Sequence, residues 1–250
     1  MEMVENRLMH LIGPTGRFAG FPKLVEALRS GSDQDLVDHV VSKMSTHYSY
    51  FFREPIHFQF LQDRLLTTWK HRETIHILSA ACAGGQEAWS CAMCVRGMQA
   101  LAGQNPSDRP GARQKVSIEG IDVAPESIKQ ARRGVYQAKD VLPFVAESAR
   151  RKYFQELPTG EFRINANLRP LCSFTVMNLL QNQHMAPASC DLVFLRTVLI
   201  YFRPDERRDL LARIHRILKP DGYLIISLSE NLADLHVPFR AHRYSIHTPK

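Results

Sequence analysis

Apolar runs and segments of helical periodicity alternate along most of the chain. Most of the runs are short and continuous, which is typical of strands buried on both faces of a parallel sheet. The predicted strands are residues 75–78, 116–121, 190–195 and 223–228. Helical patterns follow the first three strands and begin at about Gln86, Pro125 and Asp205. This order predicts an α/β fold, with a doubly wound, mostly parallel sheet and helices on both of its faces.

Two parts of the chain depart from this order. Residues 1–50 carry apolar residues at helical spacing around a polar break, which predicts a small N-terminal helical region. Residues 51–250 are expected to form the main domain, with a small antiparallel β-subdomain inserted at about 153–176. The short strands predicted for this insertion contain Phe162 with Ile164 and Phe174 with Val176. Residues 242–247 alternate in polarity and predict a last edge strand.

Composition narrows the class of protein. The 250 residues, 44% of them hydrophobic, suit one α/β domain with an appendage. Every apolar run is shorter than a membrane span and the N-terminus lacks a signal pattern, so we expect a cytoplasmic protein that is not embedded in a membrane. The formal net charge of +7 is compatible with an acidic partner. Solvated helix faces explain the basic clusters more simply, and nucleic acid is not expected.

The five cysteines form no disulfide framework. Cys91 and Cys94 have the CxxC spacing found in metal and redox sites, but no second pair of cysteines or histidines completes a zinc site. Two small apolar residues on one helix explain the spacing better. No metal is therefore expected.

Residues suited to a ligand follow four of the predicted strands. Ligands of α/β sheets bind beyond the carboxyl ends of the strands, so we expect these residues to lie together. Gly84 and Gly85 lack a Cβ atom, which lets their backbone turn sharply and approach a ligand. Asp122 ends a strand, where a carboxylate either accepts the hydroxyls of a ribose or caps a helix. The other two ends carry Arg196, Thr197 and Tyr201, and Ser229, Glu230 and Asn231. Together these residues predict a site for a nucleotide-like cofactor.

Several segments resemble motifs of a known family. They are Tyr50-Phe51-Phe52-Arg53-Glu54-Pro55, Ser79 to Met93, Asp122 with Ala131 to Tyr136, Val176 to Leu180, Arg196 to Phe202, Leu218 to Gly222, and Ser229-Glu230-Asn231. Their order and spacing, from about residue 40 to the end, resemble the CheR-type chemotaxis receptor glutamate methyltransferases. The segment at 218–222 is common to many methyltransferases. Those at 50–55, 196–202 and 229–231 are together far more specific.

The resemblance implies an S-adenosylmethionine-dependent O-methyltransferase that acts on a protein glutamate carboxylate. By matched position, Asp122 would bind the ribose hydroxyls of the cofactor and Asn178 would lie by its adenine. Arg53 and Tyr201 would be the catalytic residues, bordering the transferred methyl group and the substrate carboxylate. The cofactor-binding residues that the resemblance implies are Ala81, Gly84, Gly85, Glu87, Asp122, Asn178, Leu179, Arg196 and Thr197.

The chemistry of methyl transfer to a glutamate fits these residue types. The sulfonium of the cofactor already activates the methyl group, and a glutamate carboxylate with an ordinary pKa of about 4.3 is ionised at neutral pH without a base. The main task is to align the oxygen, the methyl group and the sulfur, which contributes up to roughly 7–11 kcal/mol in ideal cases. Arg53 would position the carboxylate. Tyr201 would orient a reactant through its hydroxyl, or would pack under the sheet edge with Phe202.

The chain departs from the family pattern at several positions. Gln86, Ala88, Trp89 and Thr197 stand where the family has Glu, Pro, Tyr and Asn, and the N-terminal region is shorter and not basic. Two alternatives therefore stay open. One is a methyltransferase acting on a small-molecule or other non-receptor carboxylate, and the other is a cofactor-binding signalling module without turnover. The expected partner is a protein with accessible glutamate side chains, such as a chemoreceptor cytoplasmic domain. The resemblance implies that a peptide of such a partner would bind the β-subdomain by adding a strand, and whether a receptor tail does so stays open.

Overall fold

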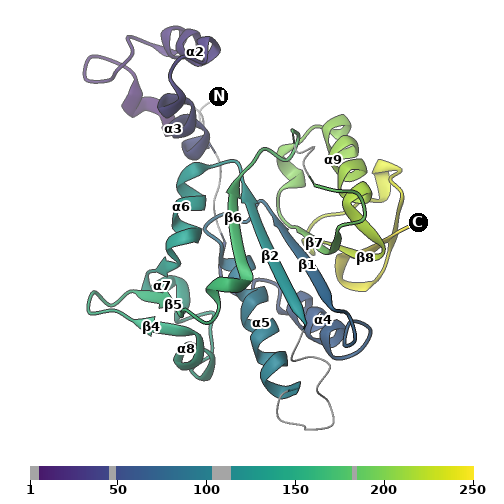
Figure 1. The fold of residues 1–250 in the computed structure, drawn as a ribbon. Coiled ribbons are helices and arrows are strands. Elements are labelled where there is room, and N and C mark those ends of the chain that lie inside the picture. The colour runs from purple at the N-terminus through teal and green to yellow at the C-terminus, as the bar shows by residue number, and fades with distance from the viewer. Residues whose placement is uncertain (1–5, 45–48, 103–113, 182–184) are drawn as a thin grey trace.

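The computed structural model describes residues 6–44, 49–102, 114–181 and 185–250. Its centre is a seven-stranded sheet in the order β6-β2-β1-β7-β8-β10-β9 (Figure 1). The strands are β1 Thr74–Ala80, β2 Lys115–Asp122, β6 Cys172–Val176, β7 Cys190–Leu195, β8 Leu218–Ile226, β9 Phe239–Ala241 and β10 Ile246–Pro249. Neighbours from β6 to β8 pair in parallel, and β10 pairs antiparallel with both β8 and β9. The predicted mostly parallel α/β sheet is confirmed.

Helices cover both faces of this sheet, because alternate residues of a strand point to opposite sides. On β1, Ile77 packs into one core cluster and Leu78 into another. The first cluster includes residues of α4 (Pro55–Leu66), α5 (Gln86–Ala102) and α6 (Pro125–Arg133), and the second includes residues of α9 (Pro204–Ile217). Figure 1 shows α6 beside β6 and α9 toward the other end of the sheet, near β7 and β8.

Proline and glycine define several helix ends. Pro55, Pro125 and Pro204 lie in the first turns of α4, α6 and α9, where a missing N–H costs no helical hydrogen bond. Gly134 ends α6 at φ 61°, in the left-handed region that favours glycine, and its N–H donates to the carbonyl of Gln130. Proline therefore sets where these three helices begin, and Gly134 sets where α6 ends. The loops next to these ends lie at the edge of the sheet.

A second, three-stranded antiparallel sheet in the order β3-β5-β4 lies beside α6. It contains β3 Val135–Tyr136, β4 Phe154–Glu156 and β5 Phe162–Ile164, with the helices α7 Ala138–Val141 and α8 Glu147–Tyr153 between β3 and β4. The prediction for Phe162 is confirmed, but that for Phe174 and Val176 is wrong, because both lie in β6 of the main sheet. The reason is that Phe174 pairs with Gly120 of β2, where a Cβ atom would come 2.6 Å from the Phe174 ring.

The C-terminal strands also differ from the prediction. The segment 242–247 is not one edge strand, because Tyr244 and Ser245 take positive φ values of 61° and 56° within a 3-10 helix, Arg243–Ser245. Extended structure resumes at Ile246, and β10 lies between β8 and β9, so that β9 forms the edge. Residues 219–222 of the motif at 218–222 lie inside β8, next to a register shift against β7.

The N-terminal residues form helices that stand apart from the sheet in Figure 1. They are the 3-10 helix Met9–Leu11, α2 Phe21–Ser30 and α3 Gln34–Met44. Leu8, Leu24 and Leu36 are buried together and form a small core of their own. The division of the chain at residue 50 and the limits of the inserted subdomain stay predictions. Among the described residues, every helix is too short or too polar to cross a lipid bilayer.

Candidate active site

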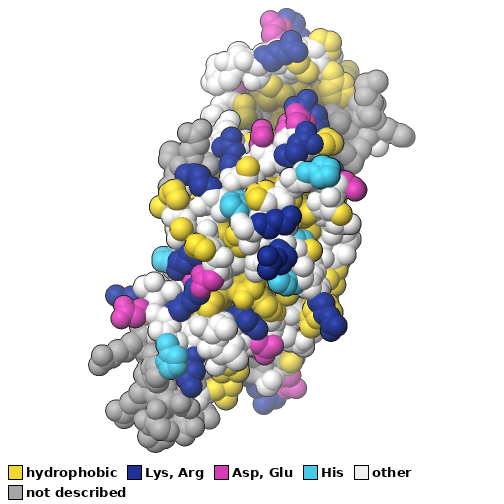
Figure 2. Space-filling model, turned by 90° about the vertical axis from the view of Figure 1, so that its right-hand side faces the viewer, with side chains coloured by type: hydrophobic (Ala, Val, Ile, Leu, Met, Phe, Trp, Pro, Cys, Tyr) yellow, Lys and Arg dark blue, Asp and Glu magenta, His cyan; other side chains and the backbone are white. Residues whose placement is uncertain are grey.

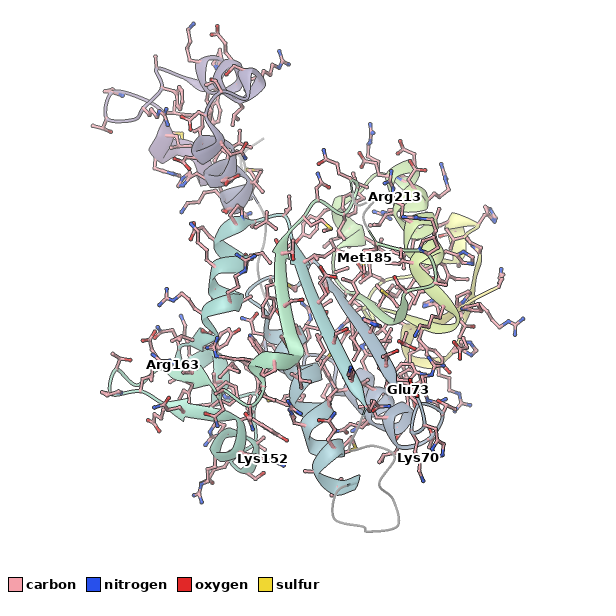
Figure 3. All side chains as sticks on the ribbon, in the orientation of Figure 1. Lys70, Glu73, Lys152, Arg163, Met185 and Arg213 are labelled. Carbon is pink, nitrogen blue, oxygen red and sulfur yellow. The ribbon has the colours of Figure 1, made fainter. Side chains whose placement is uncertain are left out.

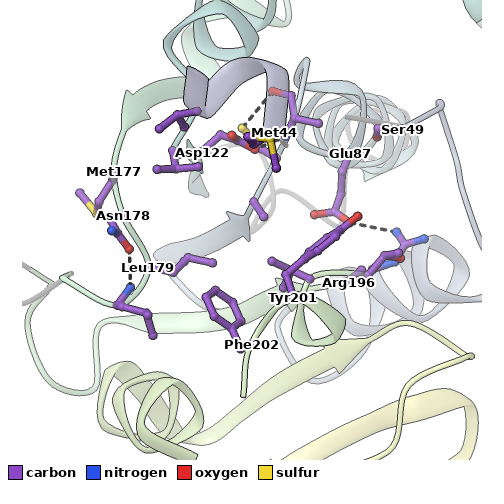
Figure 4. A pocket seen from close by; sticks show the side chains of 18 of the residues that line it. Met44, Ser49, Glu87, Asp122, Met177, Asn178, Leu179, Arg196, Tyr201 and Phe202 are labelled. Atoms are coloured by element: carbon purple, nitrogen blue, oxygen red, sulfur yellow. Dashed lines mark hydrogen bonds and ion pairs between the residues drawn. The ribbon is translucent and has the colours of Figure 1, made fainter. Parts of the chain in front are cut away.

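A cavity of about 660 Å³ opens at the carboxyl ends of β1, β2, β6 and β7. This is the edge where parallel α/β sheets bind their ligands, and the volume is that of a small-molecule site. Residues of the loops after these four strands line it, including Ala81, Asp122, Asn178 and Thr197. In Figure 4, Met177, Asn178 and Leu179 lie on one side of the cavity, and Glu87, Arg196 and Tyr201 lie on the other.

Most of the predicted site residues line this cavity, but Gly84, Gly85 and the strand-end residues Ser229, Glu230 and Asn231 do not. Those that line it are Arg53, Ala81, Glu87, Asp122, Asn178, Leu179, Arg196, Thr197 and Tyr201. Gly85 has φ +89°, and a Cβ atom on it would come 2.7 Å from the Cβ of Ala131 in α6. A Cβ atom on Gly84 would come 2.9 Å from Oε1 of Gln130. In the structure, the two glycines thus give the loop room to approach α6, and their contact with a cofactor stays a prediction.

Asp122 holds the two loops that meet at the floor of the cavity. Its Oδ2 accepts the N–H of Ala83 at 2.9 Å, and its Oδ1 accepts the N–H of Ala124 at 2.9 Å. Ala83 and Ala81 have positive φ values of 47° and 62°, so the loop after β1 is held in a conformation that costs free energy for residues with a Cβ. Each carboxylate oxygen has a second lone pair, which leaves Asp122 able to accept hydrogen bonds from a ligand.

Arg196 links two carboxylates beside the cavity. Its side chain is only 3% exposed, and its Nη1 donates to Oε2 of Glu87 at 3.0 Å while its Nε donates to Oε2 of Glu54 at 3.1 Å. The hydroxyl of Ser79 donates to the other oxygen of Glu87 at 2.6 Å. Burial raises the pKa of Glu87, although the charge of Arg196 and the hydrogen bond from Ser79 oppose this shift. A buried cation must be paired in this way, because unpaired it would lose its hydration without compensation.

The guanidinium of Arg196 also fixes the backbone of the motif at residues 50–55. Nη2 of Arg196 donates to the carbonyl of Arg53, the residue that borders the cavity. The guanidinium of Arg53 lies 5.8 Å from the ring centre of Tyr50, and that ring stacks on Phe144 at 4.5 Å. The ring of Tyr50 therefore links the guanidinium of Arg53 to the segment that leads to α8.

Tyr201 stands at the mouth of the cavity. It ends the 3-10 helix Leu199–Tyr201 that follows β7, and it is 55% exposed. The alternative that it packs under the sheet edge does not fit this exposure. On the other side of the cavity, Oδ1 of Asn178 accepts the N–H of Leu180 at 2.9 Å, which fixes the turn after β6.

Some lining residues escaped the sequence analysis. Val41 and Met44 of α3 line the cavity, as do Ser49 and Tyr50. Ser49 directly precedes the motif segment and Tyr50 is its first residue, and that position was the available signal. Val41 and Met44 belong to an apolar helix face that looks like any other core-facing stripe, so no local pattern identifies them.

Comparisons with known proteins agree with this geometry. Residues 47–246 match the family described as "CheR methyltransferase, SAM binding domain". The chain is 29% identical over 242 residues to "Chemotaxis protein methyltransferase 1" of Vibrio cholerae, covering 96% of this chain and 85% of the relative. It is 29% identical over 240 residues to "Chemotaxis protein methyltransferase" of Escherichia coli, covering 95% and 79%. A solved SAM-dependent methyltransferase from Methanosarcina mazei has a TM-score of 0.36 at 20% identity over 64% of this chain and 55% of that one.

The cavity fits the cofactor that this family binds. Its volume lies in the usual range for a small-molecule site, and Asp122 has lone pairs to spare for the hydroxyls of a ribose. The buried hydroxyl Oγ1 of Thr197, which lines the cavity, has no hydrogen-bond partner within the part of the chain that the structure describes. A polar ligand would supply the missing partner. The chain therefore belongs to the CheR methyltransferase family, enzymes whose cofactor is S-adenosylmethionine.

Proposed function

We propose that this chain methylates the side-chain carboxylate of glutamate residues in a chemoreceptor. One observation carries the proposal: Arg53 and the exposed Tyr201 line the same cavity as the residues expected to bind the cofactor. A side chain of another protein can therefore reach the point where the methyl group would lie. The printed names of the relatives, which are chemotaxis protein methyltransferases, support a receptor as that protein.

The chain's own residues divide the work of binding and alignment. Asp122 would hold the ribose hydroxyls, and Asn178 and Leu179 would border the adenine. Glu87 and Arg196, on the other side of the cavity, would face the amino-acid end. The cofactor supplies an activated methyl group on its sulfonium, and the products are the glutamyl methyl ester and S-adenosylhomocysteine.

Arg53 would hold the incoming carboxylate, and Tyr201 would orient it. A carboxylate is already a nucleophile at neutral pH, so none of these residues has to remove a proton. Arg53 is best suited to a single positioning contact, because a tight bidentate pair would reduce the nucleophilicity of the oxygen. Most of the rate enhancement then comes from proximity and orientation.

The organisation of the chain supports a protein substrate. In the proposed division, residues 1–50 form an N-terminal helical region and residues 51–250 the methyltransferase domain, with a β-subdomain inserted at about 153–176. β4 lies at one edge of the small antiparallel sheet, next to β5. An edge strand has unpaired backbone groups that accept an added strand, so a receptor tail would bind there and keep the enzyme near its target.

The test is methyl transfer from labelled cofactor to a purified chemoreceptor cytoplasmic fragment. A glutamyl ester is hydrolysed by mild alkali, so we expect the label to be released as volatile methanol. Tyr201→Phe and Arg53→Ala should each reduce the rate at least about tenfold, as loss of a positioning contact does. Tyr244→Phe, at an exposed tyrosine outside the cavity lining, is the matched control and should keep the full rate. Label that resists alkali, or that enters only small acids, would contradict the proposal.

A further inference from the structure

Glu230 accepts more backbone hydrogen bonds than a side chain in a loop usually does. Its Oε2 accepts the N–H groups of Thr197 at 2.9 Å and Ser227 at 3.0 Å. Its Oε1 accepts the N–H groups of Val198 at 3.1 Å and Leu199 at 3.0 Å. One carboxylate thus joins the loop after β7 to the end of β8.

The three amides after β7 are the ones that shape the turn leading to Tyr201. Thr197 has φ 56°, in the left-handed region, where a β-branched residue is an outlier that the surroundings must hold in place. The next residues form the 3-10 helix Leu199–Tyr201, in which the N–H of Tyr201 donates to the carbonyl of Val198 at 3.1 Å. The last amide that Glu230 binds, that of Leu199, comes only two residues before Tyr201. The hydrogen bonds to Glu230 therefore fix the backbone that leads to Tyr201.

The other end of this arrangement is fixed as well. The hydroxyl of Ser227 and the N–H of Leu228 donate to Oε1 of Glu54 at 2.8 and 3.0 Å. Glu54 in turn pairs with Arg196, which donates to the carbonyl of Arg53. The end of β8 thus binds both Glu230, which holds the loop after β7, and Glu54, which pairs with Arg196 next to Arg53.

We propose that Glu230 is a positioning residue for methyl transfer: by binding the amides of residues 197–199, it holds Tyr201 at the distance from Arg53 that the reaction requires. The proposal rests on the proposed function, because it needs Tyr201 to act on the substrate or the methyl group. It goes further in assigning a role to Glu230, which does not line the cavity.

The test replaces the carboxylate by an amide of the same size, in Glu230→Gln. An amide nitrogen donates and cannot accept, so two of the four N–H groups lose their acceptor whichever way the side chain turns. We expect the amides of residues 197–199 to exchange with deuterium at least about tenfold faster, while those of β1 keep their protection. At saturating cofactor and receptor, kcat should fall up to roughly 100-fold, the cost of a misplacement of about 1 Å, and by no more than it falls in Tyr201→Phe.

A double-mutant cycle separates positioning from a merely structural role. If Glu230 acts through Tyr201, Glu230→Gln should slow the Tyr201→Phe variant by less than about threefold, because the orientation of that hydroxyl has already been lost. Equal slowing in both backgrounds would overturn the proposal. So would unchanged amide exchange at 197–199.

Two further variants make the test sharper. Glu206→Gln changes a carboxylate that accepts the N–H of Arg203 at 2.9 Å at the start of α9, and it should alter neither kcat nor exchange at 197–199. Glu230→Asp keeps the charge on a shorter side chain and should give intermediate exchange and rate, so it carries the test if the glutamine variant does not fold. Exchange and the cycle do not depend on where the label goes, so alkali-resistant product would contradict the proposed function alone.

Discussion

At the scale of single residues, the site is held by backbone conformations that are costly in themselves. Ala81, Ala83 and Thr197, all with positive φ, surround the cavity. Each such residue costs on the order of 1–3 kcal/mol and persists only because its neighbours determine it. Asp122 and Glu230 provide that determination by accepting the N–H groups of Ala83 and Thr197. The carboxylates at the strand ends therefore shape the loops, and Asp122 also lines the cavity.

The departure from the family at Thr197 gives the first prediction at this scale. Asn tolerates the left-handed region much better than a β-branched residue does, and Thr197 also leaves a buried hydroxyl without a partner. We expect Thr197→Asn to increase the free energy of unfolding by about 1 kcal/mol. Urea unfolding of the ligand-free protein measures this change. Thr175→Asn, the same replacement in β6, lacks the strain and should give no gain; a gain there as large as at Thr197 would remove the explanation.

At the scale of elements, the motif segment at 50–55 is the joint between the two sheets. Phe51 packs edge-to-face on Tyr136 of β3 at 4.9 Å and on Phe154 of β4 at 5.4 Å. The neighbouring Tyr50 stacks on Phe144, between α7 and α8, and borders the Arg53 guanidinium. The small sheet thus supports the residue that would hold the substrate carboxylate.

This joint predicts an effect on rate from a residue outside the cavity. Phe144→Ala removes the stacking partner of Tyr50, and an aromatic pair contributes about 0.5–1.5 kcal/mol beyond its buried area. We therefore expect kcat to fall roughly two- to tenfold, measured as initial rates of label transfer. Phe144→Tyr keeps the stack and should keep the rate. Leu142→Ala, at an exposed position close by, is the control; an equal loss there would indicate a general loosening of the segment.

At the scale of elements, local sequence patterns predict some strands and helices and miss contacts between distant segments. Strands β1, β2 and β7 and the starts of α5, α6 and α9 were predictable, because periodicity, proline and strand-end chemistry are properties of short segments. The partner of Phe174 was not, because a five-residue strand of mixed polarity suits either sheet, and the space above Gly120 that selects β2 exists only in the folded chain. The residues of the site also divide into those that the sequence identified and those that it did not. Asp122 and Arg196 were identified by their positions, whereas the lining residues of α3 and the double pairing of Arg196 depend on distant contacts.

At the scale of the whole molecule, a buried histidine joins the C-terminal segment to the site. His57 of α4 is fully buried, and its Nε2 donates to the carbonyl of Tyr244 near the C-terminus at 2.7 Å. Its Nδ1 lies 3.5 Å from Oε2 of Glu54. Burial lowers the pKa of His57; the hydrogen bond to Tyr244 opposes this shift, and the nearby charge of Arg196 adds to it. In the folded state the imidazole is therefore neutral in a pH range where the unfolded chain already binds a proton.

This neutral histidine makes stability depend on pH. Below its ordinary pKa of 6.5 the unfolded state takes up a proton that the folded state does not, so the free energy of unfolding falls as the pH drops below about 6.5. The slope that His57 contributes is at most about 1.4 kcal/mol per pH unit. Burial lowers the pKa of His247 too, so the parent chain should show a steeper loss than one histidine gives.

The difference between the parent and His57→Gln isolates the contribution of His57. Glutamine cannot titrate but can still donate to Tyr244, so urea unfolding between pH 7.5 and pH 5 should show a shallower loss in this variant. Glu87, whose pKa burial raises, acts in the opposite sense: its contribution is lost as the pH rises above its ordinary value, and it cancels in the difference. His71→Gln, at an exposed position, should leave the parent slope unchanged. Identical slopes in the parent and the His57 variant would show that the pKa of His57 is the same in the folded and unfolded states, and its burial would then not be the source of the pH dependence.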